Sequence, residues 1–187
     1  MLDQIAKYRQ VVMLADGTRI LIRPLTHDDK NALIALFEPL GPEDLNLMRS
    51  DVKNRELVAS WVDNLDYKKT LPLVAVSNDR IVGDTTLHFR GGPERHIADL
   101  RIFLAKEFRR RGLGSAMLRA GIDVARKCGL RQIYAESLAE QVTPIKAFQQ
   151  LGFELHTTFP DFYLMPDGAA HDVVVLILRL GTKREEF

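Results

Sequence analysis

One stretch of the chain decides its fold: Ile102-Phe103-Leu104-Ala105-Lys106-Glu107-Phe108-Arg109-Arg110-Arg111-Gly112-Leu113-Gly114-Ser115. It has the pattern of a strand, then a basic turn with two glycines, then the start of a helix. The glycines let backbone amides approach an anion, and a helix start directs unpaired N–H groups to the same place. A solvated basic turn would explain the arginines alone, but the combination favours a phosphate-binding turn.

The turn lacks the sequence motifs of two well-known classes of phosphate-binding site. A P-loop ends in Gly-Lys-Ser or Gly-Lys-Thr, and no glycine here is followed by that pair. A dinucleotide fingerprint needs a third glycine where Met117 stands, and it follows the first strand of a parallel unit. A P-loop and a dinucleotide-binding motif are therefore both disfavoured.

Strands and two short helices are predicted before this turn. The pair Asp16-Gly17 between alternating apolar residues predicts a hairpin, and Thr26 before two aspartates predicts a helix start. The break at 41–44 separates that helix from a second one. The expected strands are 11–14, 18–25, 71–77, 80–90 and 96–104, and the second helix is 56–65.

The chain then changes from an antiparallel meander to a crossover. A helix is predicted over 112–128 and a strand over 131–137. Thr143-Pro144 predicts the cap of another helix, and strands at 153–159 and 171–180 are joined by a loop. This order predicts an α+β (mixed α/β) fold: a central mixed, mostly antiparallel twisted sheet of about seven strands with about four helices.

Composition excludes several classes of protein. The 187 residues carry 26 Lys and Arg against 25 Asp and Glu, so no overall field favours nucleic acid or anionic lipid. Cys128 is the one cysteine, so no internal disulfide can form and a reducing cytoplasmic location is expected. No apolar run predicts a signal peptide or a membrane span.

The turn and the order of elements resemble the GNAT family of acyl-coenzyme A dependent N-acetyltransferases. Its signature is Gln or Arg, two residues, Gly, one residue, and Gly or Ala, which Arg109, Gly112 and Gly114 satisfy. The resemblance extends from Ile20 to Leu180, so we expect an N-acetyltransferase domain at 20–180, with 1–19 as an N-terminal extension and hairpin strand. The stretch from Leu14 to Leu25 also resembles the acetyltransferase domain of bacterial protein-lysine acetyltransferases.

The resemblance implies acetyl-CoA (coenzyme A) as co-substrate and no metal. It places the pantetheine arm along the backbone of Ile102, Phe103 and Leu104. The side chains of these residues can pack at the same time as in an ordinary core strand. It places the pyrophosphate on the turn, and a further contact from the start of the last helix. The implied cofactor-binding residues of these two regions are Arg109, Arg110, Arg111, Gly112, Leu113, Gly114, Ser115 and Gln141.

The resemblance makes Asp99 the candidate catalytic base. A lysine-type amine has a pKa of about 10.4 and must lose a proton before it attacks. Many members carry glutamate at this place, and aspartate is one methylene shorter, which suggests a water-mediated role. Strand alternation also allows a plain surface pair with Arg101, which would suit binding of a substrate ammonium. His96 and Glu136 are lesser candidates, and the histidine spacing suggests no metal site.

The family often has a tyrosine that protonates the departing thiolate, but its place here holds Phe148. A thiol pKa of about 8.5 makes coenzyme A a fair leaving group, so water can complete the step. Phe148 and Cys128 lie on apolar helix stripes and are expected in the core. We therefore expect direct transfer in a ternary complex, with a strand amide polarising the thioester carbonyl.

The acceptor is not readable from the sequence. Family members bind it between the first two helices and the loop before the last strand, here about 37–51 and 156–171. Aromatic and acidic side chains there suit an amine, or equally anchor a solvated loop. They are Phe159, Phe162, Tyr163, Asp161 and Asp167.

Three readings of the function therefore stay open: transfer to a small amine or amino acid, transfer to a protein lysine, and a non-catalytic acyl-CoA sensor. No nucleic-acid or membrane partner is expected. Monomer and homodimer are both compatible with the sequence.

Overall fold

The structure is a computed structural model that describes residues 5–181. One eight-stranded sheet runs through it in the order β1-β2-β3-β4-β5-β6-β8-β7. The only parallel neighbours are β5 and β6, and every other pair is antiparallel. The strands are β1 Gln10–Met13, β2 Arg19–Pro24, β3 Thr70–Ser77, β4 Arg80–Phe89, β5 Ile97–Leu104, β6 Gln132–Leu138, β7 Glu154–Leu164 and β8 Ala170–Arg179.

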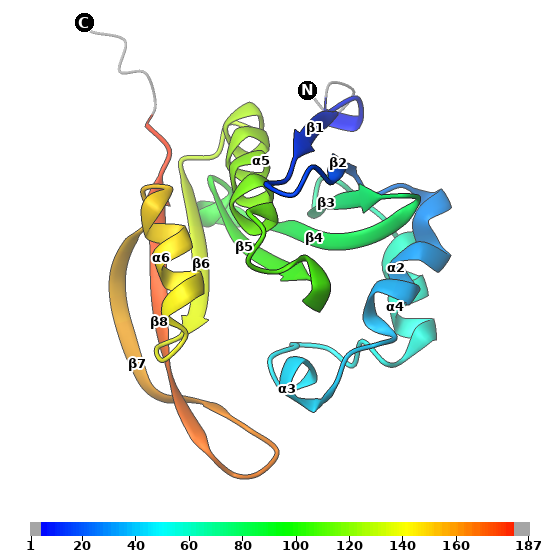
Figure 1. The fold of residues 1–187 in the computed structure, drawn as a ribbon. Helices are drawn as coiled ribbons and strands as arrows, with labels where there is room; N and C mark the ends of the chain where they lie inside the picture. Colours follow the sequence, from blue (N-terminus) through cyan, green and yellow to red (C-terminus); the bar gives the residue numbers. More distant parts are fainter. Residues whose placement is uncertain (1–4, 182–187) are drawn as a thin grey trace, which may run out of the picture.

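Helices cover both faces of the sheet (Figure 1). α5 packs against β4 and β5 on one face, and α2 and α4 pack together on the other face, where α2 meets β4. Short 3-10 turns at His27–Asp29, Gly92–Glu94 and Lys106–Phe108 connect the elements. The α-helices are α2 Lys30–Phe37, α3 Pro42–Leu45, α4 Arg55–Asp63, α5 Leu113–Lys127 and α6 Val142–Gln150.

The predicted mixed, mostly antiparallel fold is confirmed: a strand occurs in each of the eight expected ranges, and all eight belong to the one sheet, for which about seven were expected. The break expected at 41–44 contains the short helix α3. The helix cap expected at Thr143 is wrong, because α6 already begins after Gln141. The last loop is also shorter than expected, since β7 continues to Leu164. β7 tolerates Pro160 because it is the edge strand of the sheet.

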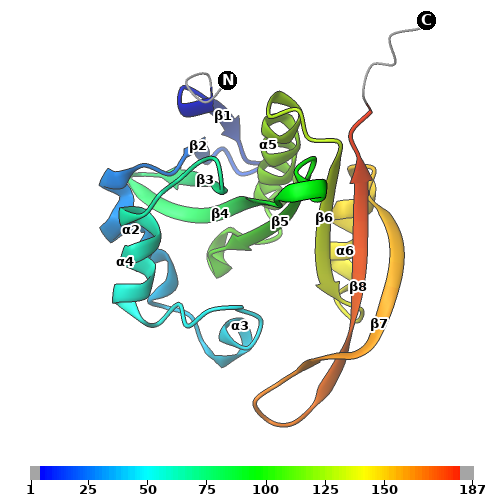
Figure 2. The same cartoon turned by 180° about the vertical axis from the view of Figure 1, so that it is seen from behind.

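The sheet divides between β5 and β6. The two strands pair only at Ile97, Ala98 and Asp99, opposite Gln132, Ile133 and Tyr134. Beyond Asp99, β5 stays with β4 as far as Leu104, and β6 stays with β8 as far as Leu138. The two halves of the sheet diverge from this junction (Figures 1 and 2). One edge of β5 is thus left without a neighbouring strand at its carboxyl end.

Glycines bring α5 close to the sheet at this point. A Cβ on Gly83 of β4 would lie 2.7 Å from Met117 Sδ and 2.8 Å from Leu104 Cδ2. A Cβ on Gly121 of α5 would lie 3.1 Å from Thr85 Cγ2. The helix therefore sits directly on β4 and β5, and its first turn is fixed beside the divided edge of β5.

Gly83→Val is expected to destabilise the protein by about 1–3 kcal/mol, the usual cost of overpacking a filled core. The added methyl groups would displace Leu104 and Met117 together. Urea unfolding followed by circular dichroism measures the change. Gly91→Ala is the matched control, because no atom lies within 4 Å of its Cβ position. Equal stability of the two variants would contradict this account of the packing.

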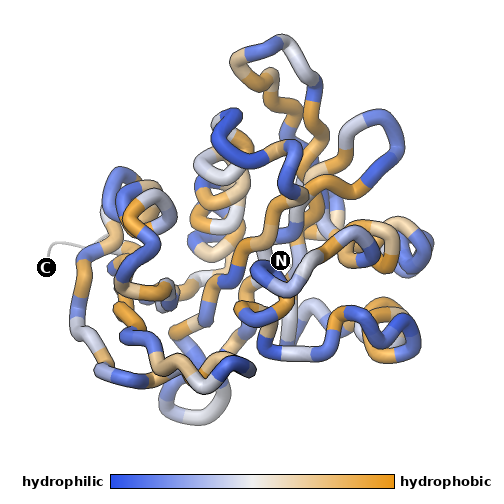
Figure 3. The backbone as a smooth tube through the Cα atoms, turned by 60° about the horizontal axis from the view of Figure 1, so that its bottom comes forward, coloured by the Kyte–Doolittle hydropathy of each residue, from blue (hydrophilic) through white to orange (hydrophobic). Residues whose placement is uncertain are grey.

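Hydrophobic segments gather in the interior of the sheet and under the helices, and hydrophilic ones lie at the turns (Figure 3). Ile20, Ile22, Leu71, Leu73 and Ile133 are fully buried side chains of this core. Within residues 5–181, no helix has the length and hydropathy needed to cross a membrane.

Candidate active site

The arginine and glycine turn is held in place by its own side chains. Arg109 Nε donates to the carbonyl of Leu104 at 2.9 Å, and its Nη2 pairs with Asp44 Oδ1 at 2.8 Å. Its guanidinium also lies 5.5 Å from the centre of the Phe103 ring. Arg109 therefore joins the end of β5 to α3 and fixes the direction in which the chain leaves the strand.

Arg111 anchors the turn on the other side. Its Nη2 donates to Thr18 Oγ1 at 2.7 Å and pairs with Asp16, both in the β1–β2 turn. Arg110 differs from its neighbours: it has φ 56°, is exposed, and makes no side-chain hydrogen bond or ion pair with any described residue. Of the three predicted arginines, Arg110 is the one whose guanidinium is available to a ligand.

The start of α5 is open. Gly112 has φ 86°, a conformation that favours glycine, and no side chain caps the helix. The N–H groups of Leu113, Gly114 and Ser115 have no acceptor within the helix, since these are its first three residues. This donor set fits a diphosphate, because unpaired backbone N–H groups lie at the positive end of a 15-residue helix and the exposed Arg110 precedes them by a few residues.

The predicted strand residues lie beside this helix start. Ile102, Phe103 and Leu104 pair on one side with Thr85, Asp84 and Gly83 of β4, and their other side is the divided edge. Gln141 lies across the division at the start of α6, where its Oε1 accepts from Ser137 Oγ at 3.4 Å. The predicted cofactor residues therefore line the division from both halves of the sheet.

Asp99 lies on the face of the sheet opposite α5, in a two-point ion pair. Arg90 Nη2 donates to its Oδ1 at 2.6 Å, and Arg90 Nε donates to its Oδ2 at 3.0 Å. The Arg90 guanidinium also covers the Tyr134 ring, 4.6 Å from its centre. The surface pair between Asp99 and Arg101 weighed from strand alternation is thus wrong, because Arg90 occupies both carboxylate oxygens.

His88 and Arg101 share this face with Asp99. His88 is directly opposite Asp99 in the β4–β5 register, and Arg101 is opposite Thr86. Burial, together with the positive charges of Arg101 and Arg49, lowers the pKa of His88 to about 4. The imidazole is therefore neutral at pH 7. Arg101 is exposed and has no ion-pair partner among residues 5–181.

Three side chains from distant segments meet beside the predicted acceptor region. Arg49, between α3 and α4, pairs with Glu136 of β6 and donates to the Tyr163 hydroxyl of β7 at 2.9 Å. The Tyr163 hydroxyl donates to Glu136 Oε2 at 3.0 Å. We call Arg49, Glu136 and Tyr163 the bridging cluster, because it joins the connection between α3 and α4 to β6 and β7.

Next to the bridging cluster, the β7–β8 hairpin presents an aromatic surface. Phe162 stacks on Tyr163 and Phe159, with ring centres 5.9 and 5.2 Å apart. Phe162 is 54% exposed and Phe159 is 43% exposed. Asp161 lies in the same strand with φ 48°, and its N–H donates to Asp172. The aromatic part of the predicted acceptor region is therefore beside the site.

Other predicted residues lie elsewhere. His96 precedes β5, at the end away from the divided edge. Phe148 is buried against Phe153, with ring centres 5.0 Å apart, so it is a core residue as expected. Cys128 is half-buried at the end of α5, and burial raises the pKa of its thiol. No group of metal-ligating side chains occurs in the described part of the chain.

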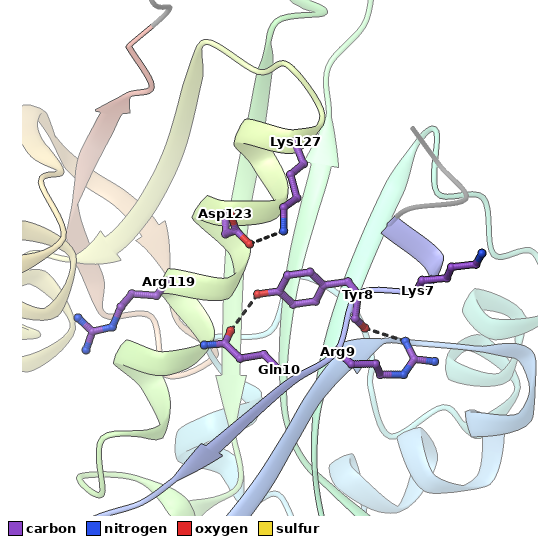
Figure 4. Close-up of a pocket in the computed structure, with 7 residues that line it drawn as sticks. All are labelled: Lys7, Tyr8, Arg9, Gln10, Arg119, Asp123 and Lys127. Carbon is purple, nitrogen blue, oxygen red and sulfur yellow. Dashed lines mark hydrogen bonds and ion pairs between the residues drawn. The ribbon is translucent and has the colours of Figure 1, made fainter.

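A separate open cavity of about 580 Å³ lies between the N-terminal segment and α5 (Figure 4). Its polar groups are largely paired with one another: Tyr8 with Gln10 at 2.9 Å, and Lys127 with Asp123 at 2.7 Å. Burial and the charge of Asp123 raise the pKa of Tyr8 to about 12. Lys127 Nζ lies 4.8 Å from the centre of the Tyr8 ring, and this contact joins the N-terminal segment to α5.

Comparison with known proteins identifies the family of the chain. The model of the acetyltransferase (GNAT) family matches residues 33–153. An acetyltransferase of Pseudomonas aeruginosa, PA5475, is 28% identical over 132 residues, which cover 67% of this chain and 69% of the relative. The chain belongs to the GNAT acetyltransferase family, whose members take the acetyl group from acetyl-CoA.

Solved structures share the fold. The GNAT domain of the S. lividans protein PAT has a TM-score of 0.77 at 23% identity, covering 94% of this chain and 98% of that domain. The yncA acetyltransferase of Salmonella typhimurium, solved with acetyl-CoA, has a TM-score of 0.75 at 18% identity, covering 88% of this chain and 96% of its own.

Sequence reasoning missed Arg90 and Arg49. Arg90 stands at the end of its strand, where its N–H donates to Ile97 O, so the hairpin register could have placed it near Asp99. Arg49 lies in an irregular connection 87 residues from Glu136, and no local pattern relates the two.

Proposed function

We propose that this chain transfers the acetyl group of acetyl-CoA directly to a primary amine in a ternary complex, with residues 20–180 as the catalytic unit. The observation that carries the proposal is the division of β5 from β6, with an uncapped helix start at one end and Asp99 beside the three-pair junction at the other. An extended donor fits along the divided edge, because it can pair with strand backbone there.

The donor would be held mainly by backbone. Ile102, Phe103 and Leu104 would bind the pantetheine arm through their free edge, and Arg110 to Ser115 would bind the pyrophosphate. Arg109 and Arg111 would act by fixing the shape of the turn, since their side chains already have partners. Gln141 would approach the donor from α6.

Arg110→Ala is expected to raise the KM for acetyl-CoA about 5-fold and to leave kcat unchanged, because a partly exposed charge contributes on the order of 1 kcal/mol. Steady-state assays of thiol release measure both constants. Arg126→Ala, an exposed arginine in the last turn of α5, is the matched control. An unchanged KM in Arg110→Ala would show that the Arg110 side chain does not bind the pyrophosphate and that the backbone of the turn binds it alone.

Proton transfer is assigned to Asp99. The Arg90 pair keeps the carboxylate oriented on the face opposite α5. The acceptor's ammonium would lose its proton to Asp99 through one water molecule, and the amine would then attack the thioester carbonyl. A strand amide of β5 would stabilise the developing negative charge on the carbonyl oxygen, and water would protonate the leaving thiolate.

The alternative is a non-catalytic acyl-CoA sensor, which the buried Phe148 in place of the family tyrosine supports. One experiment distinguishes the two. The purified chain is offered acetyl-CoA with pooled small amines and, separately, with lysine-bearing proteins, while free thiol is measured and calorimetry follows acetyl-CoA binding. Thiol release that depends on acceptor supports transfer. Binding without release supports the sensor, and absence of binding would refute both.

A further inference from the structure

We propose that the nucleotide end of acetyl-CoA binds in a cavity between β1 and the first turns of α5, where Arg119 and Gln10 bind its 3′-phosphate. This inference rests on the proposed function, because it continues the donor from the pyrophosphate on the turn. None of the residues that line this cavity belongs to the divided edge of β5 or to the predicted acceptor region. The cavity is therefore open to a part of the donor that has no assigned place.

The cavity adjoins the phosphate-binding turn and has a volume of about 290 Å³. Arg111 and Gly112 of the turn line one side, and Val12 and Met13 of β1 line another. In coenzyme A, the pyrophosphate is joined on one side to the pantetheine arm and on the other to the ribose, which carries adenine and the 3′-phosphate. With the arm along β5 and the pyrophosphate on the turn, the nucleotide end reaches this cavity. Its volume is close to the lower limit of small-molecule sites, about 300 Å³, which suits one part of a larger ligand.

The side chain of Arg111 holds the walls of the cavity together. Its Nη2 donates to Thr18 Oγ1 at 2.7 Å and pairs with Asp16, so the β1–β2 turn is fixed beside the start of α5. Its guanidinium also lies 4.8 Å from the centre of the Phe108 ring. The cavity is thus formed by contacts within the chain, and a ligand does not have to order it on binding.

One face of α5 forms a further wall. Gly112, Ala116 and Arg119 all line the cavity, and their spacing of four and three residues places them on the same face of the helix. Gly112 and Ala116, the two nearer the turn, are small and leave room for a base and its ribose. Arg119 lies about 10 Å along the helix axis from Gly112, so its guanidinium can meet a negative charge at the end of the cavity away from the turn.

Two donors for a phosphate lie at that end. Arg119 is exposed and makes no side-chain hydrogen bond or ion pair within the described range 5–181. Asp123, one turn further along α5, pairs instead with Lys127 at 2.7 Å, and Arg119 extends away from that pair (Figure 4). The Tyr8 hydroxyl donates to Gln10 Oε1 at 2.9 Å, so the Gln10 amide nitrogen is left as a donor on the side of Arg119 (Figure 4). A guanidinium and an amide nitrogen are both suited to phosphate oxygens.

β1 supplies main-chain groups for the base. It is an edge strand, and residue pairs that are hydrogen-bonded alternate with pairs that are not in an antiparallel ladder. Leu14 N–H donates to Thr18 O at 2.9 Å, so the next pair, Met13 with Arg19, is of the second kind. The N–H and C=O of Met13 therefore point away from β2, at the free edge of the sheet. Adenine presents a ring nitrogen that accepts and an amino group that donates side by side, which matches this pair of groups.

The test compares ligands that differ in the 3′-phosphate alone. Isothermal titration calorimetry measures the binding of coenzyme A and of 3′-dephospho-coenzyme A to the purified chain. The wild-type chain is expected to bind coenzyme A about 5- to 10-fold more tightly, as for a charge-assisted contact at a partly exposed site. Arg119→Gln is expected to remove this difference by weakening coenzyme A alone. Arg126→Gln is the matched control, because Arg126 is exposed about 10 Å further along the same helix and lines neither cavity.

A second variant tests the cavity itself. Ala116→Leu places a larger side chain where the base and ribose bind, so it is expected to weaken coenzyme A and 3′-dephospho-coenzyme A by the same factor. Thermal unfolding without ligand confirms that the variant is folded. Unchanged affinity of folded Ala116→Leu for both ligands would place the nucleotide elsewhere and overturn the proposal.

The outcomes separate this inference from the proposed function. Equal affinity of the wild-type chain for the two ligands would overturn the nucleotide site and leave acetyl transfer intact, as would a preference that Arg119→Gln retains. Thiol release with an acceptor tests transfer independently. A 3′-phosphate preference that depends on Arg119 supports the site even if no acetyl group moves, and absence of coenzyme A binding would overturn both.

Discussion

Asp99→Asn is expected to lower kcat by about 10²- to 10⁴-fold near neutral pH, the usual contribution of a positioned general acid or base. Asparagine keeps the shape of the side chain, but its amide cannot accept the proton of the acceptor's ammonium. Steady-state thiol release measured from pH 6 to pH 10 separates kcat from KM. At high pH, where more of the acceptor is already neutral, the deficit should become smaller.

Two further variants separate chemistry from structure. Asp99→Glu keeps a carboxylate and is expected to recover most of the activity. Arg90→Gln breaks the same ion pair but leaves the carboxylate in place, so it should lose much less kcat than Asp99→Asn. If Asp99→Asn were as active as the wild type across this pH range, Asp99 would not be the base.

Asp84→Asn is expected to stabilise the protein at pH 8 and to have no such effect at pH 4. Asp84 lies on β4 opposite Phe103, and its one side-chain hydrogen bond comes from Thr86 Oγ1 at 2.9 Å. Burial raises the pKa of Asp84 to about 7. Its ordinary value is about 3.9, so between these values the folded state keeps a proton that the unfolded state has lost. Folding stability therefore falls as the pH rises through this window.

The size of this effect follows from the pKa difference. Three pKa units correspond to at most about 4 kcal/mol, and the partial solvent contact of Asp84 reduces the expected gain to about 2 kcal/mol. Urea unfolding at pH 4 and pH 8 measures it. Thr86→Val removes the hydrogen bond to the carboxylate and should make the loss of stability with pH steeper. A gain from Asp84→Asn that is equal at both pH values would contradict the assignment.

Local sequence patterns predicted most of the fold. The Asp16-Gly17 turn, the antiparallel meander and the helix over 112–128 each depend on a few neighbouring residues, and each was predicted. Prediction was less accurate for β7, because Pro160 normally ends a strand and is tolerated there only at the sheet edge.

The site was predictable only in part, for a similar reason. The turn at 109–115 is local, so its residues could be named from the sequence. The partner of Asp99 depends on hairpin register, and the bridging cluster joins residues up to 114 positions apart. The partners of Arg109 and Arg111 also come from distant segments, so the sequence could not distinguish the structural arginines from the available Arg110.

The short junction of β5 and β6 has a consequence for the lifetime of the protein. Main-chain pairing joins residues 132–179 to β5 at three residue pairs alone, and the bridging cluster and a shared hydrophobic core supply other contacts, so we expect this segment to open at a lower cost than global unfolding. A ligand that fills the division binds the closed form and stabilises it by mass action. Resistance to proteolysis would then rise with the concentration of acetyl-CoA, which links the abundance of the enzyme to the supply of its own substrate.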